Sequence, residues 1–189
     1  MEILFLAVLI VGFLTLGLYC TKSSGGESYS NKYAKLKTEE IDSIPDDELE
    51  NAAIDWLFSK LDSKGTTEVP IMRAMSEPCR YVYATYVVTG EVMSKGMGEC
   101  FLYVDSYLLS SAVEGFLDMG AEHLAGILEK ACGVAGKFIA ENGRKNLAEL
   151  VENTELKQLS EQFETNEEII KLPDIIINYI KQNKEYFGD

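Results

Sequence analysis

The side chains best suited to acid–base chemistry in this sequence are carboxylates, and two of them flank a glycine-containing segment. Glu91 and Glu99 stand on either side of Gly96. Paired carboxylates can serve as general acid and general base in a hydrolase when both reach one substrate. Carboxylates on opposite sides of a turn need not converge, and no phosphate-binding loop or metal-binding set accompanies them. We therefore expect a protein that is not an enzyme and has no cofactor. A hydrolase that uses Glu91 and Glu99 is the least favoured hypothesis.

The remaining reactive groups offer little further chemistry. His123 is the single histidine, so the chain cannot form a zinc site with several imidazoles and offers only one residue for a Ser–His or Cys–His catalytic pair. We expect a structural or surface role for His123. The cysteines form no Cys-x-x-Cys pair, and three of them lie among apolar helical neighbours. We expect buried free thiols and no metal site from these residues: Cys20, Cys79, Cys100 and Cys132.

Negative charge is the main chemical feature of the chain. It has 31 acids against 17 bases, a formal net charge of −14. Direct binding of nucleic acid is disfavoured, because phosphate backbones require clustered Lys and Arg. Acids gathered on one face would instead attract a basic patch of another protein, although a merely solubilising surface stays open as the alternative.

Two stretches concentrate the acids. Residues 39–62 hold nine acids and one base, and seven glutamates lie within residues 149–168. The first turn of a helix favours negative charge, which by itself accounts for Asp46, Asp47 and Glu48. The residues that we expect to contact a basic partner are Asp46, Asp47, Glu48, Glu50, Asp55, Glu91, Glu99, Glu152 and Glu155.

The elements that must position these residues are helices. Apolar residues recur at intervals of three and four along residues 45–187, and strand-type alternation is absent. We expect an all-α fold, a compact domain of roughly seven or eight helices preceded by an N-terminal hydrophobic helix. Helices are predicted to begin near Pro45 and at Ser76–Glu77–Pro78, and a last one to begin at Pro173.

The segment between residues 87 and 135 has the most particular order. A helix running into Glu91 should break at the glycines, restart as a short aromatic piece, and pass into two helices hinged at Gly120. Ser111 and Glu114 form a capping-box pattern for the first of these two helices. The predicted structural motif consists of Gly96, Gly98, Phe101 and Gly120.

The N-terminal segment has a different character. Residues 3–20 carry no charge and would span about 27 Å as a helix, close to the thickness of a bilayer core. We expect residues 1–20 to anchor the chain in a membrane, 21–37 to form a flexible linker and 38–189 to form the acidic domain. Lysines on the C-terminal side favour a cytoplasmic domain. The alternative is a lipoprotein attached through Cys20.

Residues 90–101, followed by Gly120-Ala121 and the helix 124–131, resemble the acidic DNA-mimic protein family (DMP-type), which is catalogued mainly as a domain of unknown function. The first part of the family motif commonly reads Glu-Val-Asn-Asn-Gly-Gly-Phe-x-Gln-Tyr-Phe. The residues that match it are Glu91, Val92, Gly96 and Phe101. The departures include Met93 and Ser94 for the asparagine pair, Lys95 for the first glycine, and Glu99 for glutamine.

The resemblance covers roughly residues 68–187 and implies an all-helical acidic module, compatible with a homodimer. Its carboxylates would stand in for DNA phosphates and occupy the basic surface of a DNA-binding protein. A tether at residues 3–20 would restrict such a module to partners that reach the membrane face. A structural membrane-associated protein whose acids only keep it soluble remains the alternative.

Overall fold

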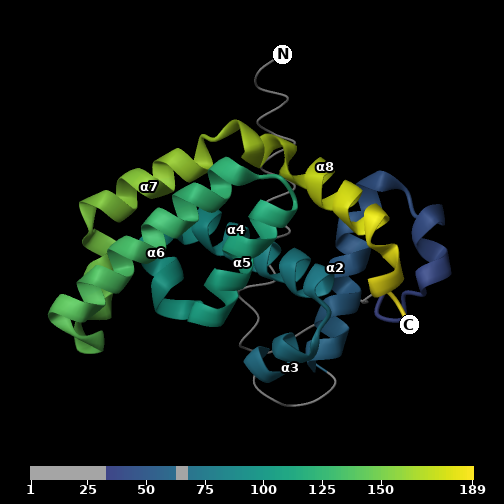
Figure 1. Cartoon of the computed structure of the whole chain (residues 1–189), viewed down its shortest axis with the longest axis horizontal. Helices are drawn as coiled ribbons and strands as arrows, with labels where there is room; N and C mark the ends of the chain where they lie inside the picture. The colour runs from purple at the N-terminus through teal and green to yellow at the C-terminus, as the bar shows by residue number, and fades with distance from the viewer. Residues whose placement is uncertain (1–32, 63–67) are drawn as a thin grey trace.

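The computed structural model describes residues 33–62 and 68–189, and these residues form helices and turns without any strand (Figure 1). The all-α class is therefore confirmed. The α-helices are α2 (Asp46–Asp62), α3 (Glu68–Ala74), α4 (Glu77–Tyr103), α5 (Ser106–Asp118), α6 (Glu122–Asn142), α7 (Thr154–Glu164) and α8 (Glu167–Gln182). Three short 3-10 segments accompany them, η1 (Thr38–Ser43), η2 (Arg144–Glu152) and η3 (Lys184–Tyr186).

The predicted membrane anchor, residues 1–20, lies outside the described residues. Among the helices of residues 33–62 and 68–189, none combines the length and the apolar character that a bilayer crossing requires. Residues 33–37, expected in the linker, pack on the domain, and Leu36 is 1% exposed. Leu36 thus belongs to the buried core.

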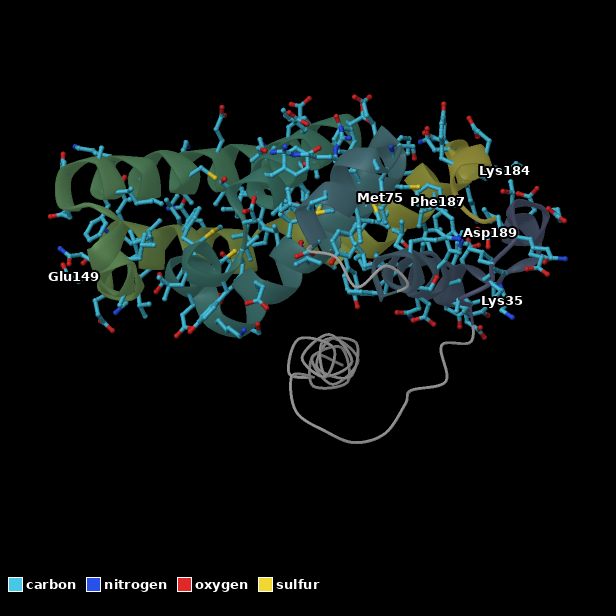
Figure 2. All side chains as sticks on the ribbon, turned by 90° about the horizontal axis from the view of Figure 1, so that it is seen from below. Lys35, Met75, Glu149, Lys184, Phe187 and Asp189 are labelled. Atoms are coloured by element: carbon cyan, nitrogen blue, oxygen red, sulfur yellow. The ribbon has the colours of Figure 1, made fainter. Side chains whose placement is uncertain are left out.

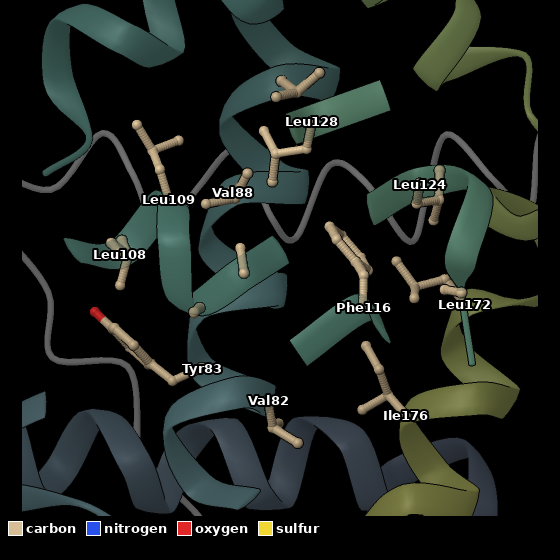
Figure 3. Packing of buried hydrophobic residues seen from close by; sticks show 14 of the residues in the cluster. Val82, Tyr83, Val88, Leu108, Leu109, Phe116, Leu124, Leu128, Leu172 and Ile176 are labelled. Atoms are coloured by element: carbon tan, nitrogen blue, oxygen red, sulfur yellow. The ribbon is translucent and has the colours of Figure 1, made fainter. Parts of the chain in front are cut away.

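Helix α4 is the central element, because α5, α7, η2, α2 and α8 all pack against it. Its buried side chains include Val82, Tyr83 and Val88, which lie in the core among residues of α5, α6 and α8 (Figure 3). Phe116 of α5 is fully buried, and its ring centroid lies 6.0 Å from that of Phe163 of α7. One continuous core thus joins elements from both halves of the chain.

The C-terminal residues close against the start of the domain. The backbone amide of Asp189 donates to the carbonyl of Leu36 at 2.9 Å, and the Thr38 hydroxyl donates to the carbonyl of Phe187 at 2.9 Å. Phe187 is fully buried. Helices α2 and α8 also pack together, so the acidic N-terminal stretch lies beside the lysines near the C-terminus.

Two predicted helix starts were wrong. Ser111 is 1% exposed inside α5, which begins earlier because the Asp105 side chain accepts the amide of Tyr107 at 2.8 Å and caps it. Pro173 lies within α8, which begins at Glu167 after the capping residue Asn166. The proline side chain is exposed, so the helix accommodates it on its outer surface. In both helices the start is set by an acceptor side chain placed before the apolar pattern.

Candidate functional site

The glycine segment forms a corner at which α4, η2 and α7 meet. Gly96 interrupts α4 with φ 82° and ψ 167°, a backbone geometry that is essentially restricted to glycine. The amide of Met97, released by this break, donates to the Ser160 hydroxyl of α7 at 2.8 Å. Ser160 donates in turn to the carbonyl of Leu156 at 3.0 Å. A buried amide at the break is therefore satisfied by a side chain from another helix.

Gly98 lets η2 approach the backbone of α4. A Cβ added at Gly98 would lie 2.6 Å from the carbonyl oxygen of Leu150 and 2.7 Å from Cα of Val151. Phe101 is half-buried and packs against the core. Gly120 has φ 82°, and the amide of Ala121 donates to the carbonyl of Phe116 at 2.8 Å, which closes α5.

Glu91 lies inside the protein and not on its surface. It is 7% exposed, and its carboxylate lies 2.9 Å from Nζ of Lys95. Lys95 also lies over the ring of Tyr103, 5.4 Å from its centroid. Lys95 is one of the residues that depart from the family motif, so this chain supplies its own counter-ion to a buried acid.

A pocket of about 410 Å³ opens at the corner. Its lining includes Glu99 of α4, Glu152 of η2 and Glu164 of α7, together with Lys95 and Lys157. The structure thus brings together Glu99 and Glu152, which lie far apart in the sequence. Glu91 is not among the lining residues, so the pair required by the hydrolase reading does not share a pocket. Within the described ranges, no group of three His, Cys, Asp or Glu side chains is placed to hold a metal ion.

The carboxylates around this pocket differ in environment. Burial, and secondly the charge of Glu161, raise the pKa of Glu164 above its usual value. A hydrogen bond from Lys157 lowers the pKa of Glu152, whose carboxylate lies 2.6 Å from the Lys157 ammonium. We define the α7 acidic face as four exposed glutamates on α7 and the end of η2: Glu152, Glu155, Glu161 and Glu164.

Acids of η1 and α2 contact partners from distant parts of the chain. Asp46 lies 2.5 Å from Nζ of Lys181, and Asp42 pairs with Lys184. Glu48 accepts the hydroxyl of Tyr33. Glu50 and Asp55 are half-buried, whereas Asp47 is exposed. Sequence reasoning missed the two lysines because they come from α8 and η3, more than a hundred residues away.

The two acidic stretches do not form one face. Figure 2 shows Glu149 at one end of the molecule and Lys184, the partner of Asp42, at the other. The α7 acidic face belongs to the Glu149 end, since η2 leads directly into α7. Of the predicted contact residues, Glu99, Glu152 and Glu155 therefore lie apart from Asp46, Asp47, Glu48, Glu50 and Asp55.

Comparison with known families supports the resemblance seen in the glycine segment. The family model described as DMP19-like protein matches residues 73–183, more than half of the chain. The chain belongs to the DMP19-like protein family. No curated protein and no solved structure matches it.

The extent of the DMP19-like region separates the two acidic stretches. It includes the corner at Gly96 and the whole α7 acidic face, but it begins after α2. The DMP19-like region therefore contains the α7 acidic face, in which Glu152 pairs with Lys157, and excludes the acids of α2.

Proposed function

We propose that the chain is a non-enzymatic binding module whose carboxylates replace DNA phosphates on the basic surface of a DNA-binding partner. The observation that carries this proposal is the α7 acidic face, four exposed glutamates inside the DMP19-like region. Helix α7 is held firmly, because Leu156, Leu159 and Phe163 are buried against α4 and α6. The carboxylates are therefore presented on a rigid support.

The mechanism is electrostatic competition with DNA. Fixed carboxylates attract the Lys and Arg side chains that otherwise contact phosphates, and they accelerate encounter with the partner. Burial and, secondly, the charge of Glu161 raise the pKa of Glu164, so repulsion between neighbouring acids accounts for part of this shift. Cations from a partner would relieve that repulsion, and salt would screen the attraction.

Neutralising three glutamates of the α7 acidic face is expected to weaken binding to basic DNA-binding proteins. We would immobilise the full chain and the variant Glu155→Gln/Glu161→Gln/Glu164→Gln, capture basic proteins at low salt, and measure displacement of DNA from each captured protein. We expect at least about a tenfold weaker interaction for the variant, corresponding to about 1.4 kcal/mol. For the unmodified chain we expect loss of binding at high salt.

The matched control is Glu39→Gln/Glu141→Gln/Glu185→Gln, which removes the same charge from exposed acids outside this face. Equal weakening by both triple variants would show an effect of net charge alone. That result, or capture of no basic protein at low salt, would favour the alternative in which the acids only keep a membrane-associated protein soluble.

We further propose that residues 3–20 hold this module at a membrane, with the domain on the cytoplasmic side. The support is the uncharged sequence of these eighteen residues and the lysines that follow it. The full chain should sediment with membranes and resist extraction at alkaline pH, and removal of residues 1–20 should release it. Release by Cys20→Ser alone would instead indicate lipid attachment, and recovery of the full chain in the supernatant would contradict any anchor.

A further inference from the structure

A second, apolar groove lies apart from the α7 pocket and shares no lining residue with it. It has a volume of about 740 Å³ and runs between the end of α4, α5 and the second half of α6, with Leu147 of η2 also in its lining. Apolar side chains in its lining are Tyr103, Leu109, Val113, Cys132 and Ile139. Tyr103 is 69% exposed, one of the largest exposed apolar side chains in the described part of the chain.

The groove stays open because α6 presents small residues along it. Its α6 wall includes Glu129, Cys132, Gly136 and Ile139, spaced by three or four residues and therefore on one side of the helix. A Cβ added at Gly136 would meet nothing within 4 Å. From residue 129 to residue 139 this wall is about 15 Å long, nearly three helical turns.

The rim of the groove is acidic. Asp105, Glu114 and Glu129 are exposed and line it, and the residues that line it in the described structure include no Lys or Arg. An apolar floor with carboxylates on both α5 and α6 complements a helix that has apolar residues on one face and basic residues beside them. A groove nearly three helical turns long has the length to hold such a helix.

We propose that this groove binds a basic amphipathic α-helix of the partner protein. The proposal rests on the proposed function for the basic character of the partner and adds where and how the partner docks. Apolar side chains of the helix at positions i, i+4 and i+7 enter the groove beside Gly136. Its Lys and Arg side chains face Glu114 of α5 and Glu129 of α6.

The test places a leucine side chain in the groove at Gly136, where an added Cβ meets nothing within 4 Å. We would label a Leu/Lys peptide of about 18 residues, with its leucines at helical spacing, and measure its fluorescence anisotropy with the full chain. Gly136→Leu is expected to weaken binding at least about tenfold. The control Gly133→Leu alters the same helix at an exposed glycine that also has nothing within 4 Å, and it should bind like the unmodified chain.

Both variants should keep the helical content and thermal stability of the original chain, because leucine has a higher helix propensity than glycine. A scrambled peptide of the same composition should bind at least about tenfold more weakly than the patterned one. Equal binding of the patterned peptide by Gly136→Leu and Gly133→Leu would overturn the groove assignment. The groove assignment would also be overturned if Gly136→Leu abolished binding to anionic lipid vesicles but left peptide binding unchanged.

The failure of this proposal can be told apart from that of the proposed function. If the groove is not the docking site, Gly136→Leu retains the peptide while neutralisation of the α7 acidic face still weakens binding of basic proteins. If the proposed function is wrong, the unmodified chain captures no basic protein at low salt, whatever the peptide does.

Discussion

Replacing Gly98 by alanine is expected to lower the free energy of unfolding by about 1–3 kcal/mol, and replacing it by valine by more. The added Cβ would lie 2.6 Å from the carbonyl oxygen of Leu150 and 2.7 Å from Cα of Val151. Both atoms belong to the backbone, so η2 must move away from α4 to admit the new methyl group. Thermal unfolding should shift downward by about 2–4 °C for each kcal/mol lost.

The control for Gly98→Ala is Gly133→Ala, the same chemical change on α6. Gly133 is exposed and has nothing within 4 Å of an added Cβ, so alanine should raise the free energy of unfolding by about 0.5–1 kcal/mol. The two substitutions thus have opposite expected signs. A Gly98→Ala variant as stable as the original chain would show that η2 does not pack against α4 as described.

Replacing Glu50 by glutamine is expected to stabilise the protein at about pH 8 by about 1–3 kcal/mol and to leave its stability near pH 4 unchanged. Desolvation by burial raises the pKa of Glu50 from 4.5 to about 7. The ammonium of Lys181 is engaged with Asp46, one turn earlier on α2, at a distance of 2.5 Å. It therefore does not serve as the counter-ion of Glu50. Because the Glu50 side chain is only half-buried, solvent screens its charge, and the stabilisation is smaller than the full pKa shift would give.

The direction of this pH dependence follows from proton uptake. The folded protein holds the Glu50 proton up to about pH 7, whereas the unfolded chain releases it near 4.5. Stability contributed by this carboxyl is therefore complete below 4.5 and is lost as the pH rises through about 7. Denaturant unfolding should show that the free energy of unfolding falls as the pH rises between these values. Glu50→Gln should make this fall smaller, whereas Asp47→Asn, at an exposed neighbouring acid, should leave it unchanged. An unchanged slope in Glu50→Gln would contradict the assignment.

Several features could be predicted from local sequence. The helix beginning at Glu77 follows Ser76 and carries Pro78, and α4 breaks at Gly96 because only glycine readily adopts φ 82° with ψ 167°. These features depend on neighbouring residues alone. The starts of α5 and α8 were missed because Asp105 and Asn166, whose side chains cap them, precede the apolar pattern used to place the helices.

The candidate site needed contacts that no local pattern contains. The Ser160 hydroxyl accepts the amide of Met97 from another helix, and Lys181 of α8 pairs with Asp46 of α2, from which it is far away in the sequence. The acids of residues 39–62 looked dominant in the sequence, yet packing of α2 against α8 places lysines beside them. The predicted contact residues therefore divide between two ends of the structure.

Composition and periodicity by themselves determined an acidic, all-helical protein, because net charge and the spacing of apolar residues are properties of the chain. The resemblance to the acidic DNA-mimic family likewise came from two local runs of residues, 90–101 and 120–131. Only the tertiary structure decided which carboxylates remain available to a partner. Burial and pairing with distant lysines set the charge that a surface displays, and both arise when helices from opposite ends of the sequence pack together.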